Sequence, residues 1–98
     1  MNIEKFNESE KLTLRIDGRI DTKTAPELDE IIKTSLDGIT SLIIDLENVS
    51  YISSAGLRVL LIAQKQMNKQ GEMKITHVNN DIMEIFEVTG FSDILTIE

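Results

Sequence analysis

Residues 45–61, DLENVSYISSAGLRVLL, decide the fold of this 98-residue chain. They begin at the end of a short apolar run, residues 42–46, whose β-branched side chains are typical of a strand covered on both faces. A brief loop leads into residues 55–63, where only Arg58 is strongly polar. A helix that is apolar nearly all round is usually buried. The stretch therefore predicts a buried strand followed by a buried helix.

The sequence before this stretch predicts two strands and a helix. Residues 11–16 alternate apolar and polar side chains, as a strand with one buried face does. Residues 3–6 predict the strand before it. The apolar side chains of residues 24–37 form one stripe of an amphipathic helix. Thr24 and Glu27 are spaced as a capping box, and we expect the helix to end at Gly38.

The sequence after this stretch predicts the remaining elements. The central helix begins at Ser53 or Ser54 and ends before Gly71. The elements expected beyond it are a strand over residues 73–78, a helix capped by Asn80 or Asp81 that ends at Thr89-Gly90, and a strand over residues 94–97. Strands that alternate with helices favour an α/β fold, a mixed sheet with helices packed over it. We expect one domain over residues 1–98.

Composition and charge exclude several classes of function. The chain has 17 acidic and 10 basic residues, a net charge of −7. Nucleic-acid binding depends on Lys and Arg contacts to phosphate, so nucleic acid is excluded as a partner, as is an anionic membrane. Because the chain has no cysteine, it has no disulfide and no thiolate metal site. With no signal-peptide pattern and no apolar run near the ~20 residues of a membrane helix, we expect a cytoplasmic protein, monomeric by default.

The junction between the central strand and helix is the most informative place for function. Unpaired backbone N–H groups and the positive end of the helix dipole meet there, beside Ser53 and Ser54. One of these serines is expected to be the N-cap, a role that is compatible with being a phosphoacceptor. Gly56, which has no side chain, would let a partner or phosphate approach the backbone.

Three segments of the chain, in the same order, resemble the STAS domain family, named for sulfate transporters and anti-sigma-factor antagonists. The first is GRID at residues 18–21, followed by Thr24-Ala25 and Leu28; the last is IFEVTGF at residues 85–91. In the central segment the matching residues are Asp45, Leu46, Val49, Tyr51, Ile52, Ser54, Gly56, Leu57 and Leu60.

The resemblance implies a phosphorylation switch. Ser54 would be phosphorylated by a partner kinase that is also the anti-sigma factor. The dephosphorylated antagonist would bind that kinase and release its target, and a PP2C-type phosphatase would reset the modified form. Ser53 stands where the family usually has Asp, which makes Ser53 a rival phosphorylation site. Ala55 stands where Ser or Thr is common, so Ser53 and Ser54 are the only candidate acceptors in the loop.

The partner surface implied by the resemblance surrounds the acceptor. Asp21 lies at a family position beside the acceptor loop, and it is equally suited to a turn. Arg58 lies one turn beyond Ser54, where it contacts a phosphate or partner or is simply solvated. The residues expected to bind the partner are Asp21, Thr24, Ser53, Ser54, Gly56, Leu57 and Arg58.

Two other functions were weighed against the switch. A non-switching STAS scaffold, or a regulatory subunit of a transporter or signalling complex, keeps the fold without the phosphorylation. A serine hydrolase is rejected, because the glycine two residues before the serine of a nucleophile elbow is absent and one lone histidine, His77, is the only candidate base. His77 has no cysteine or second histidine beside it, so no metal and no cofactor are expected.

Overall fold

The computed structural model describes all residues, 1–98, and its elements build one mixed sheet with the strand order β1-β2-β3-β4. β1 pairs antiparallel with β2, whereas β2, β3 and β4 run parallel. The predicted α/β fold with a mixed sheet is confirmed. In chain order the elements are β1 (Asn2–Glu8), β2 (Lys11–Ile20), α1 (Ala25–Ser35), β3 (Ser41–Ile52), α2 (Ser54–Gln70), β4 (Glu72–Thr76), α3 (Asn80–Thr89) and the 3-10 helix η1 (Phe91–Asp93).

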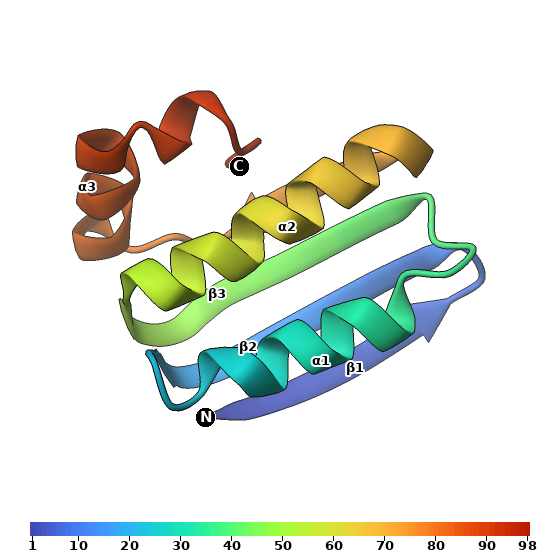
Figure 1. Ribbon diagram of the computed structural model, residues 1–98, viewed down its shortest axis with the longest axis horizontal. Coiled ribbons are helices and arrows are strands. Elements are labelled where there is room, and N and C mark those ends of the chain that lie inside the picture. The colour runs from blue at the N-terminus through green and yellow to red at the C-terminus, as the bar shows by residue number, and fades with distance from the viewer.

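The core lies between one face of the sheet and the helices. In β2, Leu12, Leu14 and Ile16 all point to this face and are completely buried. α1 and α2 lie side by side over it (Figure 1), and the apolar stripe of α1 contributes Leu28 and Ile32 to the core. α3 lies at the end of the sheet where α2 begins (Figure 1). None of the helices combines the length and the hydropathy needed to cross a bilayer.

β2 is longer than predicted. Asp17-Gly18 was expected to end the strand, but β2 continues to Ile20. The pairing with β3 shifts register on either side of Gly18, whose φ of +107° suits glycine. Because the register shifts on either side of Asp17-Gly18, β2 continues to pair with β3 beyond these two residues. Its end therefore lies beside the β3–α2 junction, where the Ser53 N–H donates to the Ile20 carbonyl at 2.8 Å.

The start of α1 differs from the predicted capping box. Thr24 has a helical backbone and makes no side-chain cap. Its Oγ1 instead donates to the Arg19 carbonyl at 2.7 Å and accepts from the Asp21 N–H at 2.8 Å. The Asp21 carbonyl accepts from the N–H of Ala25 at 2.8 Å. A turn closed by Asp21 thus starts the helix, and Glu27 has no capping role.

The C-terminal region differs from the prediction in its cap. Asn79, rather than Asn80 or Asp81, caps α3, since its Oδ1 accepts from the Ile82 N–H at 2.9 Å. Its Nδ2 donates to the Val49 carbonyl at 3.0 Å. Asn79 is favoured as the cap over Asn80 and Asp81, because its side chain satisfies two backbone groups, the Ile82 N–H and the Val49 carbonyl.

The last predicted strand is also wrong. α3 ends at Gly90, whose φ is +82°, and the chain turns into η1. Residues 94–97 then make only one bridge, Ile97 beside Ile75 of β4. Leu95 is buried, so the apolar pattern that indicated a strand comes from a segment that covers the edge of the core. Apolar spacing alone does not distinguish these two cases.

Candidate functional site

The β3–α2 junction assigns different roles to its two serines. Ser53 has an extended backbone and is the N-cap of α2; its Oγ accepts from the Gly56 N–H at 3.3 Å. The expectation that one of the serines caps the helix is confirmed. The Ser53 N–H is also bound, to the Ile20 carbonyl, so this residue is fixed through both its side chain and its backbone.

Ser54 is the first residue of α2 and is exposed. Its hydroxyl takes part in none of the hydrogen bonds within the chain, unlike the Ser53 hydroxyl. No acidic residue lies in the first turn of α2, so the positive end of the helix dipole is not compensated there by a side chain. The geometry therefore offers a free hydroxyl at a place where negative charge is stabilised.

Gly56 and Leu57 point into the protein. A Cβ on Gly56 would lie 2.7 Å from Ile20 Cγ2 and 2.7 Å from Ile52 Cγ1, so the first turn of α2 packs too closely on the two strands for any side chain. Leu57 is 6% exposed and belongs to the core. Glycine is thus required at position 56 because Ile20 and Ile52 of the sheet leave no space for a side chain. The expected approach of a partner to Gly56 from outside, and contact with Leu57, do not agree with this burial.

Asp21 and Thr24 form a closed turn on the neighbouring strand end. Asp21 Oδ1 accepts from the Thr24 N–H at 3.1 Å and from the Lys23 N–H at 3.0 Å, and it lies 3.2 Å from Thr24 Oγ1. The Thr24 N–H, above all, lowers the pKa of the Asp21 carboxyl below its ordinary value of 3.8. The turn role of Asp21 is confirmed. Its other oxygen, Oδ2, lies 3.7 Å from Arg19 Nε.

Arg19 is a residue of this end that the sequence reasoning missed. Its guanidinium lies 4.4 Å from the centre of the Tyr51 ring, in addition to its ion pair with Asp21. Arg19 and Tyr51 are directly paired between β2 and β3. Arg19 stands two residues before Asp21 in the segment GRID, which was the available signal. Its pairing with Tyr51, however, depends on the register shifts between β2 and β3, where β3 contributes the extra residues.

A groove separates the first turns of α1 and α2. It has a volume of about 200 Å³ and is lined by Thr22, Ala25, Pro26, Asp29, Ala55, Arg58 and Val59. Arg58 is exposed at its edge and takes part in no ion pair, whereas Asp29 pairs with Lys33 at 2.9 Å. Of the residues expected to bind the partner, Asp21, Thr24, Ser53, Ser54 and Arg58 are exposed or half-buried.

A second polar cluster lies on the other face of the sheet. Asp45 is 6% exposed; its Oδ1 accepts from the Glu47 N–H at 2.9 Å and lies 3.1 Å from His77 Nδ1. Its Oδ2 lies 3.7 Å from Arg15 Nε. Donor atoms of Asp45, Glu47 and His77 lie within 4.8 Å of one another. The Arg15 guanidinium already neutralises the buried carboxylate and would repel a cation, so the cluster is explained as an ion-pair network.

This arrangement does not activate either serine as a nucleophile. A nucleophilic serine needs a base within hydrogen-bond reach. The only histidine, His77, contacts Asp45, and no carboxylate or imidazole bonds either hydroxyl. What this end of the molecule presents is an accessible hydroxyl, a cation on Arg58 and a groove, which suit recognition by another protein.

Comparison with known proteins agrees with this geometry. Residues 2–98 match the STAS domain family. The anti-sigma-B factor antagonist of Staphylococcus aureus is 32% identical over 99 residues, which span 99% of this chain and 92% of the relative. An anti-sigma factor antagonist from Mycobacterium paratuberculosis has a similar structure, with a TM-score of 0.87 and 22% identity over 98% of this chain and 83% of that one. Unphosphorylated SpoIIAA, also an anti-sigma factor antagonist, has a TM-score of 0.79 and 16% identity over 99% and 87% of the two chains. The chain therefore belongs to the STAS domain family, in its group of anti-sigma factor antagonists.

Proposed function

We propose that this protein is a phosphorylation-controlled interaction switch. Unphosphorylated at Ser54, it binds an anti-sigma factor that is also a serine kinase, and this releases the target of that factor. A PP2C-type phosphatase regenerates the binding form. The observation that carries the proposal is the exposed Ser54 hydroxyl, which no group of the chain binds, at the first position of α2.

The division of roles between the serines favours Ser54 over Ser53 as the acceptor. The Ser53 oxygen is already used by the Gly56 N–H, so phosphorylation of Ser53 would change the cap of α2. A phosphate on Ser54 extends into solvent instead. SpoIIAA, which shares the fold, has been solved in an unphosphorylated and a phosphorylated form; that protein therefore accommodates the modification in this architecture.

Electrostatics explain how the phosphate acts as a switch without unfolding the domain. Phosphoserine carries about −1.5 to −2 charges, which the N-terminus of α2 stabilises. Arg58, one turn further on the helix, adds a cation on the same side. A partner that packs on the unmodified helix end meets instead a bulky, hydrated dianion. A loss of about 2.7 kcal/mol in binding corresponds to a hundredfold loss of affinity.

The same geometry supports a binding role without catalysis. The chain contributes the phosphoacceptor, and the partner kinase and phosphatase contribute the chemistry. We propose that the encounter takes place in the cytoplasm. Asp21, Thr24, Ser53, Ser54 and Arg58 form the contact surface, while Gly56 and Leu57 shape it from beneath.

Intact-mass analysis of the protein from its native cells tests the acceptor. We expect a form heavier by about 80 Da, the mass of one phosphate group, located on Ser54 and missing in Ser54→Ala. Ser50→Ala is the matched control, since Ser50 is another exposed serine at the end of β3 and should leave the modification unchanged. Phosphate found only on Ser53 would show that Ser53, not Ser54, is the acceptor. A chain that stays unmodified under all growth conditions would favour the scaffold function.

Binding to the kinase then tests the switch. The kinase is identified as the protein that transfers phosphate to the wild type and not to Ser54→Ala. Its affinity for the unmodified chain should exceed its affinity for the phosphorylated chain at least a hundredfold. Equal affinities would show that phosphorylation does not control this contact, whatever the site.

A further inference from the structure

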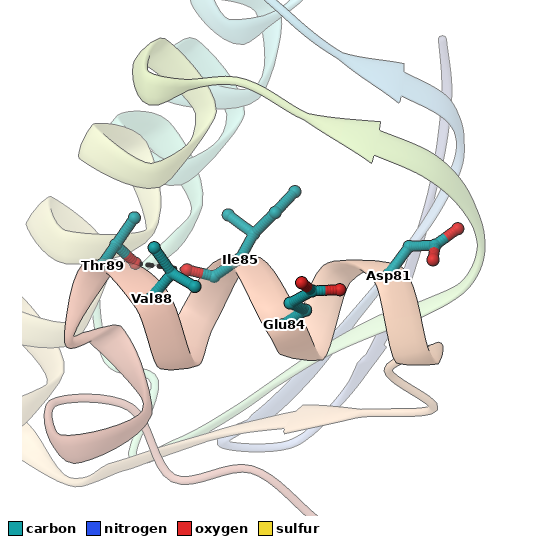
Figure 2. Close-up of a pocket in the computed structure, with 5 residues that line it drawn as sticks. All are labelled: Asp81, Glu84, Ile85, Val88 and Thr89. Atoms are coloured by element: carbon teal, nitrogen blue, oxygen red, sulfur yellow. Dashed lines mark hydrogen bonds between the residues drawn. The ribbon is translucent and has the colours of Figure 1, made fainter.

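α3 carries a stripe of exposed side chains, together with the half-buried Ile85, on its outer side. Asp81, Glu84, Ile85, Val88 and Thr89 line a shallow hollow of about 300 Å³ along the helix (Figure 2). Val88 is 79% exposed, more than any other exposed large apolar side chain. Asp81 and Glu84 belong to none of the ion pairs. We name Asp81, Glu84, Ile85 and Val88 the acidic stripe.

The charge around the acidic stripe is strongly one-sided. Residues 79–98 contain five carboxylates and no Lys or Arg: Asp81, Glu84, Glu87, Asp93 and Glu98. Only Glu98 has an ion-pair partner, Lys74. A surface that combines an exposed apolar side chain with uncompensated negative charge is complementary to one that combines an exposed apolar side chain with positive charge.

The chain itself provides such a surface on the second half of α2. Ile62, Lys65, Gln66 and Lys69 line another hollow, of about 410 Å³, and we name them the basic stripe. Ile62 is 40% exposed. Lys65 and Lys69, like the carboxylates of the acidic stripe, take part in no ion pair. Two complementary faces of one chain are thus both unoccupied.

The two stripes have the same spacing when one is taken in reverse. The basic stripe runs i, i+3, i+4, i+7 from Ile62 to Lys69, and the acidic stripe runs i, i+3, i+4, i+7 from Asp81 to Val88. Each therefore extends about 10.5 Å along its helix. Antiparallel packing of the two helices brings Val88 onto Ile62 at one end and Asp81 next to Lys69 at the other. Between these ends Lys65 lies opposite Ile85, which its aliphatic stem can cover, and Gln66 lies opposite Glu84.

We propose that the partner of the acidic stripe is the basic stripe of a second copy of this chain. The contact is heterologous, so each copy keeps one free stripe and the association grows as an open chain. At about 0.15 M salt the Debye length is ~8 Å, which confines electrostatic interactions to the contacting faces and weakens the repulsion between two chains of charge −7. This self-association goes beyond the proposed switch, and neither stripe includes Ser54 or Arg58. The protein is then a monomer only when dilute.

Complementary charge variants test the proposal. One variant carries Lys65→Glu and Lys69→Glu, and the other carries Asp81→Asn and Glu84→Lys; Asp81 is not reversed, because a cation at the start of α3 would oppose its dipole. Sedimentation velocity then follows the mass against concentration. The wild type should grow from its monomer mass of 11.1 kDa, and about 1 M salt, with a Debye length of ~3 Å, should reverse the growth. Each variant alone should stay monomeric.

The equimolar mixture of the two variants is the decisive sample. It retains one intact acidic stripe and one intact basic stripe, so it should associate to at least a dimer, with about twice the monomer mass. Lys11→Glu with Lys23→Glu is the matched control, with the same charge change at exposed sites outside both stripes, and should associate like the wild type. A wild type that is monomeric at every concentration overturns the proposal. So does growth that survives in either variant, or a mixture that stays monomeric.

Discussion

The first turns of α1 and α2 lie at the same end of the molecule and are fixed in different ways. At α1, the Asp21 carboxylate and the Thr24 hydroxyl bind each other and the surrounding backbone, so both side chains are fully engaged. At α2, Ser53 alone makes the cap, and the neighbouring hydroxyl of Ser54 stays free. The free hydroxyl of Ser54 is therefore separate from the hydrogen bonds that hold the start of each helix.

Close packing beneath α2 should matter more than either cap. Gly56→Val would place methyl groups where Ile20 and Ile52 already lie, since even a Cβ would come within 2.7 Å of both. We expect unfolding in urea to show a loss of about 3 kcal/mol, the upper end of the usual cost of overpacking. Ser54→Val, the same side chain at an exposed position, should change stability by less than about 0.5 kcal/mol. Equal losses in the two variants would contradict the inward role of the glycine.

Removal of the α2 cap should have the next largest effect. Ser53→Ala leaves the Gly56 N–H without its acceptor, and the loss of an N-cap costs about 1 kcal/mol. Ser53→Asp, which restores a capping oxygen, should recover most of that loss. Thermal or urea unfolding of the three proteins measures the difference. If Ser53→Ala is as stable as the wild type, the hydrogen bond to Gly56 does not hold the helix start.

The stability that the Asp21 turn at the start of α1 contributes should depend on pH. The pKa of Asp21 is lower in the folded chain than its ordinary 3.8, chiefly because the Thr24 N–H donates to it. The stability it contributes is therefore complete above 3.8 and is lost as the pH falls through the lower, folded-state pKa. Relative to Asp21→Asn, the wild type should keep a constant advantage above about pH 5 and lose it on further acidification. Asp37→Asn corrects for the removal of one negative charge.

The smallest effect is expected at Ser54 itself. Ser54→Ala removes a hydroxyl that binds nothing within the chain, so the free energy of unfolding should change by less than about 0.5 kcal/mol. A calorimetric comparison with Ser53→Ala gives the sharpest contrast between adjacent positions. A loss in Ser54→Ala as large as that in Ser53→Ala would mean that the two serines share the capping.

Much of the fold followed from local pattern, because the sheet and helices bury faces with regular spacing. The central strand and helix, the stripe of α1 and the strand before α3 were all predicted from it. The errors lie where backbone geometry overrides pattern. β2 continues past Asp17-Gly18 through a shift in register. The chain after Gly90 turns into η1, and the mostly apolar residues 94–97 that follow make only one bridge to the sheet.

The serine loop at the start of α2 was predictable from the sequence, whereas the packing around it was less so. Ser53, Ser54 and Asp21 are close in sequence to recognisable helix starts. The inward orientation of Gly56 depends on how near α2 lies to two strands, and the stacking of Arg19 on Tyr51 depends on strand register. Both features depend on tertiary structure and cannot be predicted from composition or periodicity.

The hydrogen bond from the Ser53 N–H to the Ile20 carbonyl has a consequence for folding. β1 and β2 join through a tight hairpin that pairs Glu8 with Lys11, but the parallel pairings among β2, β3 and β4 span about a third of the chain, as between Lys11 and Ser41. Such distant contacts close late and slow the folding of a domain. The loop that carries Ser53 and Ser54 is anchored across one of these late pairings. The surface around the Ser54 hydroxyl therefore takes its final shape only when the chain has finished folding.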